Sequence, residues 1–243
     1  MSSQFSTPSH LSPRQKSPDK AKIYLITAVV SVVIIGLILY VASQTLSEDK
    51  HDTPTPQPEP SSSYNIKPFV IAANTLGIDA INTWNKVEQG DFTAVLPPRL
   101  KALSEDELAA RIRDQNVQIP DASILLMALD EKTDFNEVNV TITRILSTSS
   151  MTPEVYAEGV AAEFNENKYT IEDIFAYQLG SRRVGRVIYS KTFSTPVIGP
   201  FSGVHFAYVQ DNVIWVITGT ALSADFDDWL PIFEVIAREF EIN

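Results

Sequence analysis

Residues 211–243, "DNVIWVITGTALSADFDDWLPIFEVIAREFEIN", are the most informative about the fold, because they predict a buried strand followed by the helix that covers it. Side chains are apolar at every position from 213 to 217, which is the pattern of a central strand covered on both faces rather than of a strand at the surface. We expect Val213, Trp215 and Ile217 on one face of the sheet and Ile214 and Val216 on the other.

The second half of the stretch predicts a closing helix. Pro231 is compatible with this helix because it falls in the first turns. Apolar residues recur at helical spacing and form the stripe that should cover the strand. The stripe consists of Trp229, Ile232, Phe233, Ile236 and Phe240.

An acidic cluster, Asp225, Asp227 and Asp228, stands where this helix begins. It admits two interpretations. One is a site for a divalent cation, although Leu230 and Ile236 occupy the positions at which an EF-hand loop needs glycine and glutamate. The other is a helix start, where a capping residue and carboxylates in the first turn complement free amides and the helix dipole. We favour the helix start and leave cation binding as an open alternative.

Upstream, the sequence predicts further strands and helices. The expected elements are a helix over 69–87 stopped by Gly90, a strand in "FTAVLPP", a helix opened by the capping box Ser104 and Glu107, strands in "ASILLMALD" and "EVNVTITRIL", a helix opened by Thr152 and Pro153, and strands over 171–179, in "VGRVIYSKTF" and in "GVHFAYV". In "EVNVTITRIL" apolar residues alternate with Asn139, Thr141 and Thr143, which predicts one buried and one polar face.

A membrane anchor is predicted near the N-terminus. Residues 23–43, "IYLITAVVSVVIIGLILYVAS", contain no charge over about the 20 residues that cross a bilayer. Basic side chains dominate before this segment and acidic ones follow it, so the positive-inside rule places the N-terminus in the cytoplasm and residues after Ser43 outside it. A cleaved secretory signal is the competing interpretation, but its apolar core is usually shorter, about 7–15 residues.

The organisation follows from composition. We expect a disordered cytoplasmic tail over 1–22, the transmembrane helix over 23–43, a Pro/Ser-rich linker over 44–63 and an extracytoplasmic α+β domain over 64–243. The first 63 residues hold as many basic as acidic side chains, so the whole net charge of −11 belongs to that domain. Such a charge disfavours nucleic acid as a partner.

Residues from "FTAVLPP" onward, including "DFNEVNVTITRI", "RVIYSKTF", "HFAYVQDNVIWVITGTA" and "FDDWLPIFEVIAREFEI", resemble in their order the PsbP-like superfamily. That superfamily groups the extrinsic photosystem II subunit, a Ran-binding import factor and bacterial envelope proteins of the DcrB and LpqN kind. The resemblance implies an antiparallel sheet flanked by helices, an α/β/α sandwich, and a role in binding or assembly rather than catalysis. The helix expected at 69–87 and the membrane anchor depart from the usual plan of the family.

No catalytic constellation is evident. There is no cysteine, no P-loop, dinucleotide fingerprint or G-x-S-x-G elbow, and we predict no catalytic residue, metal or cofactor. His205 stands alone in a strand, where a packed or surface residue is commoner than a ligand.

Two neighbouring segments are candidates for contact with a partner. The only basic cluster of the acidic domain, Arg182, Arg183 and Arg186, could bind phosphate, a lipid headgroup or an acidic partner, or it could be a solvated hairpin tip. The loop "STPVIGPFSG" is expected to expose Val197, Ile198 and Phe201 at a partner-contacting edge.

Three functions remain open on the sequence. The leading hypothesis is a non-enzymatic binding or assembly module, anchored in the cytoplasmic (inner) membrane of a bacterium and facing another envelope protein in the periplasm. The second is a structural subunit of an envelope secretion or division complex. The third is a small-ligand-binding domain with a pocket between sheet and helix, against which a sheet face filled by Trp215, Trp229 and Phe233 would count.

Overall fold

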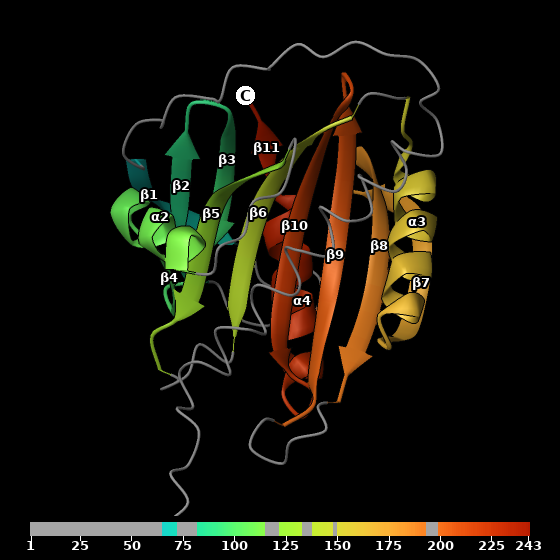
Figure 1. Ribbon diagram of the computed structural model, residues 1–243. Helices are drawn as coiled ribbons and strands as arrows, with labels where there is room; N and C mark the ends of the chain where they lie inside the picture. Colours follow the sequence, from blue (N-terminus) through green and yellow to red (C-terminus); the bar gives the residue numbers. More distant parts are fainter. Residues whose placement is uncertain (1–64, 72–81, 115–121, 133–137, 148–149, 193–198) are drawn as a thin grey trace, which may run out of the picture.

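The computed structural model describes residues 65–71, 82–114, 122–132, 138–147, 150–192 and 199–243 (Figure 1). The predicted tail, transmembrane segment and linker lie outside these residues. No helix within the described ranges is long and apolar enough to span a bilayer.

The chain forms antiparallel strands joined by three described helices. In chain order the elements are β1 (Asn65–Ile71), β2 (Asn82–Gln89), β3 (Phe92–Leu96), β4 (Leu100–Ala102), α2 (Glu105–Asp114), β5 (Ala122–Asp130), β6 (Asn139–Leu146), α3 (Pro153–Glu166), β7 (Thr170–Leu179), β8 (Arg182–Lys191), β9 (Phe201–Gln210), β10 (Val213–Leu222), α4 (Phe226–Arg238) and β11 (Glu241–Ile242). They build a smaller sheet of order β1-β2-β3-β11 and a larger one of order β4-β5-β6-β10-β9-β8-β7. The expected α+β class with antiparallel sheets and helices is confirmed.

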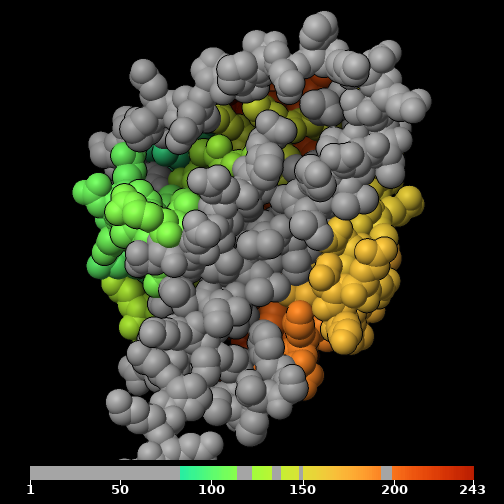
Figure 2. All heavy atoms as spheres, in the orientation of Figure 1, coloured from blue at the N-terminus to red at the C-terminus, as the bar shows by residue number. Residues whose placement is uncertain are grey.

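Strand β10 lies at the centre of the larger sheet, between β6 and β9. Trp215 and Ile217 belong to the hydrophobic cluster that contains α4, whereas Ile214 and Val216 belong to the cluster that contains α3. The predicted alternation is therefore confirmed, and α3 and α4 cover opposite faces (Figure 1). On the face of α3, helix α2 stands at the opposite margin of the sheet (Figure 2).

The helix expected over 69–87 is wrong at both of its described ends. Residues 65–71 and 82–89 are strands β1 and β2, which pair antiparallel with Phe69 opposite Trp84. Gly90 lies in the turn between β2 and β3 rather than after a helix. Because β2 gains hydrogen-bonded neighbours on both sides, β1 and β3, sheet pairing prevails over a helical spacing of apolar residues.

The polar face of strand β6 is buried, which differs from the expected exposure. Its polar side chains Asn139, Thr141 and Thr143 are buried, with 9%, 4% and 0% of their surface exposed. Both neighbours of β6 in the sheet, β5 and β10, pair along almost its whole length. The alternation of apolar and polar residues thus predicted correctly which side chains share a face of β6. It did not predict that the polar face is buried.

Local signals at helix and turn boundaries are confirmed. The Glu107 side chain accepts hydrogen bonds from the backbone and hydroxyl of Ser104, at 2.8 Å each. Thr152 caps α3 through a hydrogen bond accepted from the Val155 amide, with Pro153 as the first helical residue. The β9–β10 turn places Asp211 and Asn212 at positive φ, which these residue types tolerate.

Candidate functional site

The three arginines of the predicted contact cluster lie on β8 and all have partners within the domain. Arg182 donates to the carbonyl oxygen of Phe240 and its guanidinium lies 4.3 Å from the centre of the Tyr208 ring. Arg183 forms an ion pair with Glu154. All three arginines are thus engaged by their own fold, 57% of the Arg183 side chain is solvent-exposed, and their contact with a partner stays a prediction.

Arg186 is largely buried, with 13% of its side chain exposed. Its guanidinium binds Glu234 at 2.5 Å and Asp173 at 2.9 Å, and it lies 4.1 Å from the centre of the Phe175 ring. Two carboxylates and an aromatic face therefore surround one cation. Arg186 joins α4 to the outer strands β7 and β8, which is a structural role.

Of the three apolar residues expected to be exposed in the loop, only Phe201 lies among the described residues. Val197 and Ile198 lie outside the described residues. Phe201 is the first residue of β9 and only 4% of its surface is exposed, so its expected exposure is wrong. Its ring contacts those of Tyr169 and Tyr189, because β9 turns this side chain into the core beneath α3.

The acidic cluster lies at the start of α4, as the favoured interpretation predicted. Asp227 and Asp228 occupy the first turn, whereas the Asp225 side chain makes no capping hydrogen bond. The backbone carbonyl of Asp225 accepts hydrogen bonds from the amides of Asp228 and Trp229 instead. Within the described residues, no group of three or more His, Asp or Glu side chains is arranged to hold a metal ion.

His205 is fully buried on the face of β9 that α3 covers. The rings of Phe164 and Tyr189 pack edge-on against it at 5.3 and 5.2 Å. Neither ring nitrogen has a hydrogen-bond partner among the described side chains and backbone. Burial lowers the pKa of His205 to about 3, so the imidazole is neutral near pH 7. The interpretation as a packed residue is confirmed.

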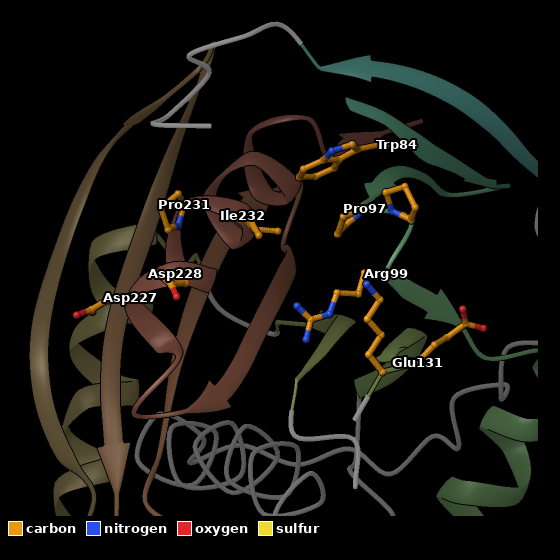
Figure 3. A pocket seen from close by; sticks show the side chains of 10 residues that line it. Trp84, Pro97, Arg99, Glu131, Asp227, Asp228, Pro231 and Ile232 are labelled. Carbon is orange, nitrogen blue, oxygen red and sulfur yellow. The ribbon is translucent and has the colours of Figure 1, made fainter. Parts of the chain in front are cut away.

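A surface cleft of about 790 Å³ opens where the smaller sheet meets the start of α4 (Figure 3). One wall is α4 and the other consists of the β3–β4 turn and the end of β5, with the Trp84 indole at one end of the cleft. The lining residues are Trp84, Pro97, Pro98, Arg99, Glu131, Lys132, Asp227, Asp228, Pro231 and Ile232.

Arg99 is held rigidly in this cleft by a buried carboxylate. Asp130, whose side chain has 0% exposure, accepts a hydrogen bond from Arg99 Nε at 2.9 Å and lies 2.5 Å from Nη2. The Lys132 amide also donates to Asp130, at 3.0 Å. The Arg99 guanidinium lies 4.9 Å from the centre of the Trp229 ring, and 42% of its side chain stays exposed toward the cleft. A two-point ion pair and an aromatic face together fix the donors that remain.

The other charges of the cleft divide into paired and unpaired groups. Glu131 forms an ion pair with Lys101 at 3.4 Å. Asp227, Asp228 and Lys132 have no ion pair within the described part of the chain. The cleft thus offers proline rings, a fixed arginine and unpaired charges of both signs, while the Trp84 indole is packed into its wall with 2% of its surface exposed. This set suits noncovalent recognition of a ligand that is partly apolar and partly charged.

Next to this cleft, aromatic side chains fill the space between α4 and the larger sheet. Trp215, Trp229 and Phe233 have 4%, 5% and 1% of their surfaces exposed, and the rings of Trp229 and Phe233 stack at 5.8 Å. This packing counts against a deep pocket inside the domain and leaves the cleft at its rim.

Most of the cleft is not predicted by the sequence patterns. Trp84 falls within the helix expected over 69–87, and Pro97 and Pro98 close the strand expected in "FTAVLPP". A run of two prolines and an arginine directly after a buried strand was the available signal, because prolines set apolar rings on a rigid turn.

No protein-family model matches the chain, and no curated protein matches it. Among solved structures, it is similar to cyanobacterial PsbP (CyanoP) from Synechocystis sp. PCC 6803, with a TM-score of 0.45 and 10% identity over 63% of this chain and 87% of that one. It is also similar to LpqN of Mycobacterium tuberculosis, a protein involved in cell envelope biogenesis, with a TM-score of 0.36 and 13% identity over 51% of this chain and 79% of that one.

A protein of Bacteroides thetaiotaomicron VPI-5482 is similar with a TM-score of 0.37 and 9% identity, over 63% of this chain and 45% of that one. The PsbP and LpqN neighbours are two of the kinds of protein that the sequence resemblance names. At these identities the likeness concerns the fold alone.

Proposed function

We propose that this protein is a membrane-anchored, non-enzymatic binding module that holds an envelope partner on the outer side of the cytoplasmic membrane through the cleft at the start of α4. Its N-terminal tail lies in the cytoplasm, and the acidic domain binds protein rather than nucleic acid.

The observation that carries this proposal is the construction of the cleft. Four separate segments, around Trp84, Arg99, Lys132 and Asp228, meet there, although they are far apart in the sequence. Rings and fixed donors on a rigid scaffold lower the ordering cost of binding. The charged groups of its lining, Arg99, Lys132 and Asp228 among them, can pair with charges of a partner.

Membrane topology is tested with single cysteines, since the chain has none of its own. We expect Ser61→Cys to react with a membrane-impermeant maleimide in intact cells and Ser9→Cys to react only after permeabilisation. Labelling of both positions in intact cells would contradict the proposed anchor, and labelling of neither would contradict the outward orientation.

The cleft is tested by photocrosslinking of the full chain in intact cells. A benzoylphenylalanine at Ile232 should capture one defined protein, whereas the same residue at Val155, which is exposed on α3, should not. Asp228→Lys should reduce the capture at Ile232, because it reverses a charge of the cleft wall. Equal capture at both positions would contradict recognition by the cleft.

A small ligand is the second candidate, because the volume of the cleft lies within the usual range of small-molecule sites, about 300–1,000 Å³. Capture of a lipid or a small molecule in place of a protein at Ile232 would favour it. A structural subunit of a secretion or division complex would instead lose function when residues 1–22 alone are deleted.

A further inference from the structure

Strand β7 forms the outer edge of the larger sheet. It stands at the end of the strand order and, among the described strands, pairs only with β8 (Figure 1). The strand has ten residues, Thr170–Leu179. An edge of this length presents a row of backbone donors and acceptors to which another strand can add.

Apolar side chains are exposed on this edge. Ile174 and Phe175 each have 38% of their surface exposed, and they are two of the four large hydrophobic residues exposed in the described part of the chain. Consecutive residues of a strand point to opposite faces, so an added strand would cover apolar surface on both sides of the sheet.

Only one half of the edge carries the features that normally prevent strand addition. A β-bulge lies between Ile171 and Asp173, with the acidic Glu172 inside it. From Ile174 to Leu179 the strand contains no charge, no proline and no glycine. Bulges and charges keep edges apart, so the unguarded half is where a strand can add.

The cation beside Phe175 is already paired within the domain. The Arg186 guanidinium packs on its ring at 4.1 Å and is bound by both Asp173 and Glu234. The Tyr177 ring lies 5.0 Å from that of Phe175. The exposed ring is therefore held in place before any partner arrives, which lowers the cost of association.

The uncharged half of β7 can pair with itself in a register that brings apolar residues together. Two copies related by a two-fold axis perpendicular to the sheet pair antiparallel, and the residue on the axis faces itself. An axis at Asp173 would oppose two carboxylates, which is unfavourable. An axis at Phe175 opposes Phe175 to Phe175, Ile174 to Ala176 and Asp173 to Tyr177, so that apolar groups meet and no like charges face each other.

We propose that this protein self-associates through β7, with two copies adding edge to edge in antiparallel register about Phe175. The occupant of the edge is a second copy of this chain, and the two larger sheets become one continuous sheet. This surface lies apart from the cleft, so the inference does not depend on the proposed function.

The register is tested in the full chain in its membrane, with single cysteines introduced into the cysteine-free sequence. Two differently tagged variants, Ile174→Cys and Ala176→Cys, are co-expressed and oxidised mildly. We expect a disulfide between them at least about tenfold more abundant than for Leu146→Cys with Ala176→Cys, because only facing positions meet the distance a disulfide requires. Leu146 is a matched control, since 47% of its surface is exposed on another strand.

Sedimentation of the purified full chain in detergent gives an independent measurement. Ile174→Lys should weaken self-association by about tenfold or more, because an unpaired ammonium would enter an apolar contact. A melting curve like that of the parent shows that the variant is folded. No excess of the 174–176 disulfide over the control would overturn the proposal, as would a disulfide of Ile174→Cys with a different protein alone. A dimer held by other parts of the chain would persist in Ile174→Lys and would equally contradict it.

Discussion

Gly219 on β10 lies directly against the face of the Phe233 ring on α4. A Cβ atom added to Gly219 would approach Phe233 Cγ to 2.4 Å. The ring is buried between helix and sheet, with 1% of its surface exposed, and it also stacks on Trp229. The absence of a side chain at Gly219 thus sets how closely α4 can approach the central strand.

We expect Gly219→Ala to destabilise the domain by about 1–3 kcal/mol, the usual cost of overpacking a core. Gly90→Ala is the matched control, because nothing lies within 4 Å of an added Cβ there. Urea denaturation of both variants measures the difference. Equal unfolding midpoints for Gly219→Ala and the parent would show that α4 moves freely relative to β10.

His205 should make the domain less stable in acid. Its pKa is about 3 in the fold, against an ordinary value near 6.5, so below about pH 6.5 the unfolded chain binds a proton that the folded chain does not. Stability should therefore fall, as pH decreases from about 6.5 toward 3, by up to about 1.4 kcal/mol per pH unit from this residue.

His205→Met should remove this contribution while filling a similar volume. The measurement is the free energy of unfolding of both proteins at several pH values. We expect the variant to gain stability relative to the parent as the pH falls. A constant difference across that range would mean that His205 is protonated in the folded state or is solvated there.

Arg99→Met should leave the Asp130 carboxylate buried without its ion-pair partner. We expect a loss of about 2–3 kcal/mol, below the usual cost of breaking a buried pair because 42% of the Arg99 side chain is exposed. Lys101→Met, which breaks the exposed pair with Glu131, should cost at most about 0.5 kcal/mol. Similar losses in the two variants would argue that Asp130 is solvated once Arg99 is removed.

Tyr208→Phe should destabilise the domain by about 1 kcal/mol, because the Tyr208 hydroxyl donates a buried hydrogen bond of 2.7 Å to the Ala237 carbonyl at the end of α4. The buried hydroxyl of Tyr156 has no hydrogen-bond partner among the described residues, so Tyr156→Phe should be neutral or stabilising. The measurement is the melting temperature of each of the two variants relative to that of the parent. The reverse order of stability would contradict this assignment of hydrogen bonds.

Sequence patterns predicted most of the larger sheet and its helices. The alternating faces of β10, the capping box at Ser104 and the cap at Thr152 were all inferred correctly from the sequence. Each of these depends on neighbours within a few residues along the chain, or on a period of two in a strand covered on both faces.

The surroundings of the candidate residues could not be predicted from the sequence, as Arg182 and Phe201 illustrate. Contact of Arg182 with a partner stays a prediction, and the fold brings the rings of Tyr208 and Phe240 to this side chain. Phe201 follows a segment rich in proline and glycine and so was expected to be exposed, yet strand pairing turns it toward Tyr169. Both outcomes are decided by residues distant in the chain, which local composition does not reveal.

Local patterns in the sequence were sufficient to predict the kind of element over most of the described chain, because backbone periodicity, caps and turn residues act over short distances. Composition alone gave the acidic character of the domain and the lack of cysteine. Three features required the folded structure: residues 82–89 are a strand, the polar face of β6 is buried, and Trp84, Arg99 and Asp228 line one cleft. These depend on which distant segments pair and pack, and long-range contacts form only when the whole chain folds cooperatively.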